Sequence, residues 1–277
     1  MTDDWTIDEL MCVCISRQVR DGEVLAQGLA TPLVAAGYLL AWHTHAPNVT
    51  FASAIGQTLC EEGAPLGLTT VESLWLDKAI ASFGFIQAAA DLLPTVKPKE
   101  FFRPGQVDAQ GHFNNLAIGR DYQKPRLRLP GAGGIPDVST FMDGIYLYVP
   151  RHSRITFVRN LDFRSGLGHS KERMRGFGTV YLVSNLGEFD FINQSMRIVS
   201  LHPGVRLEDV VSKTGFILDV AQELQTTSAP DAQEIHLLRN VIDPLGIRKL
   251  EFLSGHKRNA AIRAILESEQ LIYSPAS

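Results

Sequence analysis

A glycine cluster is the clearest group of residues that could take part in chemistry. Gly131, Ala132, Gly133 and Gly134 stand just before a helix predicted over Asp137–Met142. Backbone N–H groups in such a turn, close to a helix N-terminus, can hold an oxyanion or a phosphate. The cluster lacks the G-x-G-x-x-G spacing of dinucleotide folds, and no Gly-Lys-Ser/Thr follows it. A tight structural turn is therefore an equally good interpretation.

A second candidate is the loop after the strand predicted over Val49–Ser53. Its residues are Ser53, Ala54, Ile55, Gly56 and Gln57. Open α/β sheets place their ligands at the carboxyl ends of strands, so this loop is in a suitable position. Its side chains are nearly all inert, and Gln57 is the main hydrogen-bonding group.

Two carboxylates follow that loop, Glu61 and Glu62. A pair of carboxylates can do acid–base work. Paired glutamates on a protein surface are more often simply solvated, so both interpretations stay open.

The histidines and cysteines give weaker indications of a functional site. His43 and His45 resemble a metal pair, but no third ligand of suitable spacing is near, so we expect a helix-end turn and no metal site. His112 lies in a predicted turn and could touch a ligand. The three cysteines are too few for a disulfide framework, which favours a chain kept reduced in the cytoplasm.

Composition narrows the class of protein. The 277 residues are 45% hydrophobic and 20% charged, with a formal net charge of −4. This balance argues against a nucleic-acid partner, which usually meets a basic surface. The acidic N-terminus indicates no signal peptide, and the longest apolar stretch, 29–42, is broken by Thr31, Pro32 and Gly37. We therefore expect no membrane partner and a chain with a large core.

The elements that must position these residues begin with an α-β-α-β series. Thr6 and Glu9 form a capping box that opens a helix ending at Asp21–Gly22. A strand over Glu23–Gln27 follows, then a helix from an N-cap at Thr31 to about Trp42, then the strand over Val49–Ser53. This alternation predicts a parallel sheet covered by helices. Further predicted elements are a helix over 71–83, strands over 99–102 and 145–149, and the helix over 137–142.

The last third has a different character. Strands over 180–184, 188–191 and 196–201 form a predicted β-meander with a turn at Asn185–Gly187. Helices are predicted over 207–214 and 231–241, and an amphipathic helix over 259–271 ends the chain. The simplest organisation is one α/β domain over 1–250 with a C-terminal helical tail over 251–277. We expect that helix to pack on a subunit surface.

The order of several short motifs resembles a known family. They are Asp21–Val24, Pro47, Gly56, Gly105–Gly111, Pro130–Gly134, Val183–Asp190, His202–Val205, Thr214–Phe216 and Ile242–Pro244. As an ordered set over residues 10–250 they resemble the β subunit of class I (glutaconate-type) CoA-transferases.

The resemblance implies an open, mainly parallel α/β sheet with helices on both faces, the CoA-transferase or NagB-like fold. It also implies an α-subunit partner in an αβ or α2β2 assembly, with an acyl-CoA thioester as substrate and no permanently bound cofactor. In that family a glutamate of the β subunit attacks the thioester, and the glycine-rich loop helps to hold it. The substrate- or CoA-binding residues that the resemblance indicates are Ser53, Ala54, Gly56, Gln57, Gln106, Asn114, Asn115, Gly131, Ala132, Gly133 and Gly134.

The sequence departs from the family at the nucleophile. Counted from Ala46–Pro47, the glutamate position falls on Ala54, and a methyl group cannot form a covalent acyl intermediate. Relatives without this glutamate resemble hydrolases that open a steroid-derived ring by C–C cleavage, or decarboxylases with cysteine at that position. The segments 181–191 and 195–204 look closest to the ring-opening hydrolases.

The resemblance therefore favours hydrolysis or retro-Claisen C–C cleavage in bacterial catabolism, with no certain catalytic residue in this chain. One alternative is a true CoA-transferase that uses Glu61, Glu62 or a residue of the α subunit. A second alternative is a structural subunit that only completes the partner's pocket.

Overall fold

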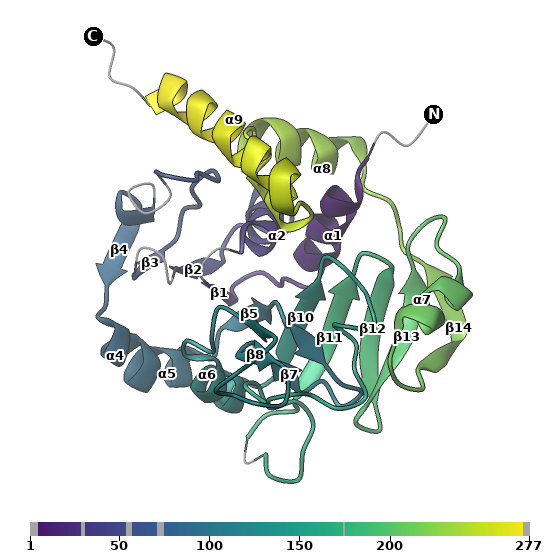
Figure 1. The fold of residues 1–277 in the computed structure, drawn as a ribbon. Coiled ribbons are helices and arrows are strands. Elements are labelled where there is room, and N and C mark those ends of the chain that lie inside the picture. Colours follow the sequence, from purple (N-terminus) through teal and green to yellow (C-terminus); the bar gives the residue numbers. More distant parts are fainter. Residues whose placement is uncertain (1–4, 29–30, 54–56, 71–74, 174, 274–277) are drawn as a thin grey trace. The chain divides into compact units, whose positions relative to one another are not determined.

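The computed structural model describes residues 5–28, 31–53, 57–70, 75–173 and 175–273. Figure 1 shows the ribbon coloured along the sequence. The chain divides into two compact units. The first unit contains 1–84 and 229–277, and the second contains 85–228. The predicted boundary at residue 250 does not coincide with the boundaries of these units, and it stays a prediction.

The first unit opens with the predicted α-β-α-β series. Helix α1 (Ile7–Ser16), strand β1 (Val24–Gln27), helix α2 (Pro32–His43) and strand β2 (Thr50–Ser53) all form. The Glu9 carboxylate accepts the Thr6 N–H at 2.8 Å, as the capping box predicts. Thr31 occupies the predicted N-cap position of α2, but its hydroxyl donates to the Gly28 carbonyl and does not cap the helix. A carboxylate oxygen of Glu251 accepts the Leu33 N–H at 3.0 Å and caps this helix from far along the chain.

The strands of the first unit form a mixed sheet in the order β1-β2-β3-β4. Strands β1 and β2 are parallel, while β3 (Thr58–Cys60) and β4 (Ala79–Ser82) extend the sheet by antiparallel pairing. The helix predicted over 71–83 is therefore wrong at 79–82, and 71–74 lie outside the described residues. Short apolar runs do not distinguish helix from strand by periodicity, and pairing with β3 decides this one.

The C-terminal part of the first unit is helical. Helix α8 (Ala232–Leu237) begins at the predicted Asp231 cap, with the Glu234 N–H donating to the Asp231 carboxylate at 2.8 Å. It is followed by a π-helical turn (Leu238–Ile242), a 3-10 helix (Ile247–Glu251) and the C-terminal helix α9 (Gly255–Tyr273). In place of the predicted start at 259, α9 begins four residues earlier. It packs on its own chain through Ile265 and Glu269, which are both buried.

The second unit is built on a sheet in the order β14-β13-β12-β11-β10-β5. Strands β5 (Lys99–Phe102), β10 (Ile145–Val149) and β11 (Thr179–Ser184) are parallel neighbours. Strands β12 (Gly187–Ile192) and β13 (Ser195–Leu201) complete the predicted meander, and β14 (Asp219–Thr226) runs parallel to β13. The α/β class is confirmed, but the described pairing is mixed rather than mainly parallel.

Helices and small ribbons surround the second unit's core. The helices are α4 (Phe85–Gln87), a π-helical turn (Ala88–Leu92), α5 (Leu93–Val96), α6 (Ile135–Phe141) and α7 (Leu207–Lys213). Two short ribbons pair β6 (Gln106–Val107) with β7 (Phe113–Asn114) and β8 (Ala117–Ile118) with β9 (Leu127–Arg128). The core beneath them includes Phe102, Phe113, Leu147, Phe157 and Phe189. Among the described residues, no helix is both long and apolar enough to cross a membrane.

Candidate functional site

The candidate loop 53–57 begins where two parallel strands end side by side. Ser53 at the end of β2 is opposite Gln27 at the end of β1, and both are buried. The predicted position at the carboxyl ends of parallel strands is therefore correct. Ala54, Ile55 and Gly56 lie outside the described residues. Gln57 is exposed with a φ of 52°, and its backbone carbonyl accepts the Phe83 N–H at 2.9 Å.

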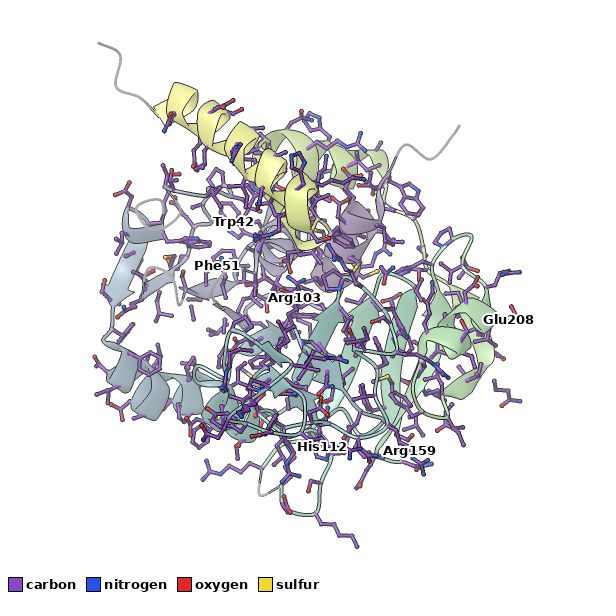
Figure 2. The ribbon with its side chains drawn as sticks, in the orientation of Figure 1. Trp42, Phe51, Arg103, His112, Arg159 and Glu208 are labelled. Atoms are coloured by element: carbon purple, nitrogen blue, oxygen red, sulfur yellow. The ribbon has the colours of Figure 1, made fainter. Side chains whose placement is uncertain are left out.

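Aromatic rings pack against the β2–β3 hairpin, which is the antiparallel pair formed by these two strands. Phe51 of β2 packs against Trp42 of α2 at 6.3 Å between ring centroids (Figure 2 labels both residues). It also packs against Trp75 at 5.4 Å between ring centroids. The Cys60 thiol of β3 donates to the Trp75 carbonyl at 3.4 Å. Phe51 and Trp75 are both buried, so strand β2 rests on a buried aromatic contact up to the point where the candidate loop begins.

Glu61 and Glu62 lie at the other end of the hairpin. Cys60 pairs with Phe51 and Thr58 pairs with Ser53, so the chain has run back along β2 before it reaches these glutamates. At about 3.3 Å per residue, roughly 10 Å of strand separates them from the loop. Both are exposed, and an ion pair with Lys78 lowers the pKa of Glu62. Their predicted part in catalysis would need a large rearrangement of this hairpin.

The glycine cluster of the second unit forms an open turn before α6. Gly131 and Gly133 have φ angles of 109° and 51°, and a Cβ atom at either would meet nothing within 4 Å. The Gly131 N–H donates to the Asn115 carbonyl at 2.9 Å, whereas no described residue accepts from the N–H of Gly133 or Gly134. The turn is fixed at one end and leaves two backbone donors available.

Gln106, Asn114 and Asn115 lie in the segment that binds one end of this turn. Asn114 is 0% exposed, and its amide donates to the Gln106 side chain at 2.8 Å and to the Ala117 carbonyl at 2.7 Å. The Asn115 side chain accepts the Gly105 N–H at 2.9 Å. Sequence reasoning missed Asp162, which accepts from the Gln106 amide at 3.1 Å. These side chains hold the segment 105–117 together, and the Asn115 carbonyl of this segment accepts the Gly131 N–H of the glycine turn.

His112 also holds its own loop together. Its Nδ1 accepts the Gly168 N–H at 2.9 Å, and burial lowers its pKa to about 4 (Figure 2 labels this residue). Asp108 accepts the N–H groups of Gln110 and His112, each at 3.0 Å, while burial raises its pKa to about 6. This neutral histidine is therefore a part of the turn, and its predicted contact with a ligand stays untested.

His43 ends α2, and His45 lies in the turn that follows it. His45 lies 3.1 Å from the Val19 carbonyl through Nε2 and 3.1 Å from the Thr44 hydroxyl through Nδ1. Burial lowers the pKa of His43. Within the described ranges, no three His, Cys, Asp or Glu side chains are grouped so that they could hold a metal ion.

Three motifs of the last third meet in one buried polar network. Ser184 contacts His152 Nδ1 at 3.1 Å, and the Ser184 carbonyl accepts from His202 Nε2 at 2.7 Å. Thr214 and Thr227 complete the network at 3.0 Å from His152 Nε2 and 2.9 Å from His202 Nδ1. Burial lowers the pKa of His152 to about 3, so this ring is neutral. These motifs satisfy buried polar groups where β11, β13 and α7 end.

Comparison with known proteins identifies the family. The chain is 30% identical over 260 residues to the β subunit of 3-oxoadipate CoA-transferase from Pseudomonas knackmussii, covering 85% of this chain and 92% of that protein. It is 32% identical over 257 residues to the cholesterol ring-cleaving hydrolase IpdB subunit of Mycobacterium tuberculosis, covering 89% and 98%. No family profile matches the chain.

Solved structures agree with these relatives. The decarboxylase AibA/AibB superposes with a TM-score of 0.77 at 30% identity, covering 89% of this chain and 98% of that chain. The chain therefore belongs to the family of CoA-transferase β subunits. It is a subunit of an enzyme with the CoA-transferase fold, in a family that includes transferases, a ring-cleaving hydrolase and a decarboxylase. The predicted resemblance is confirmed.

Proposed function

We propose that this chain is the β subunit of a heteromeric enzyme that acts on an acyl-CoA thioester by hydrolysis or by retro-Claisen C–C cleavage. The observation that carries the proposal is Ala54 at the position that the family resemblance assigns to the nucleophilic glutamate. Alanine has no nucleophilic group, so a covalent intermediate on this residue is impossible. The 32% identity to a cholesterol ring-cleaving hydrolase subunit supports the same reading.

The proposed cleavage requires a base and an oxyanion site. A base removes a proton from water, and the resulting hydroxide adds to a ring ketone of the acyl group. The C–C bond next to that carbonyl then breaks, leaving a carboxylate and an enolate that takes up a proton. The open N–H groups of Gly133 and Gly134 are suited to hold the thioester oxygen while negative charge develops there. We assign the base to the partner subunit, because Ala54 replaces the family's glutamate and Glu61 and Glu62 lie at the other end of the β2–β3 hairpin.

We propose a CoA-transferase-like α subunit as the partner, in an αβ or α2β2 assembly. The chain exposes large apolar side chains that such a subunit could cover, and Ile217 is 92% exposed. Other examples are Ile86 and Phe177. We place the enzyme in the cytoplasm, which three free and buried cysteines support. The CoA thioester is the substrate in this proposal, without a permanently bound cofactor.

Trapping of the acyl-enzyme tests the proposal. The co-purified heteromer is incubated with acetoacetyl-CoA and acetate, treated with borohydride or hydroxylamine, and mapped by mass spectrometry. We expect no glutamyl-CoA adduct on this chain and no transfer of CoA to acetate. The Ala54→Glu variant is the matched control for trapping, because it restores the family's nucleophile.

An adduct on Glu61 or Glu62 would contradict the proposal and favour a CoA-transferase. That alternative has support of its own in the 30% identity to the β subunit of 3-oxoadipate CoA-transferase.

The glycine turn gives a second prediction. Gly133→Asp is expected to raise KM for the acyl-CoA about tenfold relative to Gly133→Asn. Both side chains fit the open space and tolerate the φ of 51°, so only the negative charge differs. Steady-state kinetics of the heteromer measure the ratio, and equal KM values for the two variants would remove this turn from the site.

A further inference from the structure

The C-terminal helix carries a carboxylate that is almost completely enclosed. Glu269 of α9 is 1% exposed, although most of the neighbouring helix surface is in solvent. Its oxygens accept the N–H groups of Leu68 at 2.6 Å and Thr69 at 2.9 Å. They also accept the hydroxyls of Thr69 at 2.6 Å and Thr70 at 3.1 Å. One side chain thus holds three consecutive residues that lie about 200 positions earlier in the chain.

The segment held by Glu269 is followed in the chain by Trp75 and β4, which contact the β2–β3 hairpin. Its start is tied down by the Leu66 N–H, which donates to the Ile242 carbonyl at 2.9 Å. Further along the chain, Trp75 packs under Phe51 of β2, and β4 pairs with β3. The segment ends where the Phe83 N–H reaches the Gln57 carbonyl. Within the described parts of this segment, residues 66–70 contact α9, and residues 75–83 contact both ends of the β2–β3 hairpin.

We propose that Glu269 is a positioning residue, which holds Leu68–Thr70 and thereby fixes the hairpin that presents Ser53 and Gln57 to the acyl-CoA. The site it positions rests on the proposed function. The family resemblance ends near residue 250, so nothing in it implies a role for this helix.

The charge of Glu269 is what makes it an effective clamp. Burial raises the pKa of Glu269, and the hydrogen bonds from Thr69, Leu68 and Thr70 lower it. Together the hydrogen bonds outweigh burial, so the pKa lies below its ordinary value. The group is therefore ionised at neutral pH, and hydrogen bonds to an ionised acceptor are about twice as strong as neutral ones. A glutamine at this position would offer one acceptor oxygen and set an NH2 group against these donors.

Amide hydrogen exchange of the full chain tests the positioning without any substrate. Glu269→Gln and the milder Thr69→Ala are compared with Glu267→Gln, which is two residues away on the exposed face of α9. We expect exchange at Leu68 and Thr69 to accelerate by at least about tenfold in Glu269→Gln. We also expect faster exchange at Phe83 and in β3, with Thr69→Ala intermediate and Glu267→Gln like the wild type.

Kinetics of the heteromer with acetoacetyl-CoA complete the test. A positioning role predicts that Glu269→Gln raises KM at least fivefold with a smaller change in kcat, while a melting curve confirms a folded chain. If exchange rises only at 68–70, and β3, Phe83 and KM stay as in Glu267→Gln, the proposal is overturned. If the wild-type heteromer does not turn over acyl-CoA at all, the proposed function fails, and exchange at Phe83 and β3 still decides whether Glu269 positions the hairpin.

Discussion

Replacing Arg248 with methionine is expected to lower the free energy of unfolding by about 3–5 kcal/mol. Arg248 is 1% exposed, and its guanidinium lies 2.9 Å from Asp8, 2.9 Å from Glu9 and 2.8 Å from Asp243. Methionine fills a similar volume but leaves these buried carboxylates without their shared cation. An uncompensated buried charge is strongly destabilising, so the loss exceeds that of a simple change in packing.

The neighbouring Arg239 cannot replace the missing cation. It already binds Glu9 through two nitrogens, at 2.7 and 3.0 Å. Burial alone would raise the pKa of Glu9, but the hydrogen bonds from Arg239 and Thr6 and the charge of Arg248 lower it below its ordinary value. Without Arg248, this carboxyl is expected to titrate at a higher pH.

Urea denaturation at pH 7 measures the effect of Arg248→Met. The control is Arg206→Met, which removes an exposed arginine paired with Asp209 and is expected to leave stability nearly unchanged. An equal loss of stability in the two variants would show that the buried network adds nothing beyond a surface pair.

Replacing Glu100 with glutamine is expected to stabilise the protein at pH 9 and to have little effect at pH 5. Glu100 lies on β5. Burial raises its pKa from 4.5 to about 8. The folded chain therefore prefers the protonated acid, and ionisation of this group opposes folding.

The sign of the pH dependence follows from that raised pKa. The stability that the neutral acid provides is complete below about pH 4.5 and is lost as the pH rises through about 8. At about 1.4 kcal/mol per pKa unit, the full shift corresponds to an upper limit of about 5 kcal/mol. Part of the side chain reaches solvent, so we expect a difference of about 2–3 kcal/mol between the variants at pH 9.

Denaturant unfolding of wild type and Glu100→Gln at pH 5, 7 and 9 provides the measurement. Glu223→Gln, on the exposed strand β14, is the matched control and should follow the wild type at each pH. A constant difference between Glu100→Gln and wild type over this range would contradict the raised pKa.

Elements marked by a local cap or turn signal were predictable from the sequence, although α1 ends at Ser16, before the predicted stop at Asp21–Gly22. The Thr6 and Glu9 pair located α1, the Asn185–Gly187 turn located the meander, and Asp231 located α8. Strands β4 and β14 were missed because they lack such signals. Strand β14 is largely exposed and shows no alternation of apolar residues, so its structure depends on pairing with β13.

The candidate site was predictable where short motifs carry it. The glycine turn precedes α6 as the sequence indicated, and Ser53, the first residue of the predicted loop, ends β2 beside the end of β1. The residues that hold them were not predictable, because their partners are far apart in sequence. Asp162 reaches Gln106 across 56 residues, and Glu269 reaches Thr69 across 200. No local pattern marks either contact, since each depends on how the completed chain folds back.

The discontinuous first unit also sets an order for folding during synthesis. Its N-terminal helix presents Asp8 and Glu9 early, but their partner Arg248 is translated about 240 residues later. At about 5–20 residues per second, the ribosome needs roughly 10–50 s to reach that point. During this interval the whole second unit is made, so it can fold first. The nascent N-terminal segment must meanwhile keep its acidic groups in water, because the buried ion-pair network cannot form before Arg248 is made.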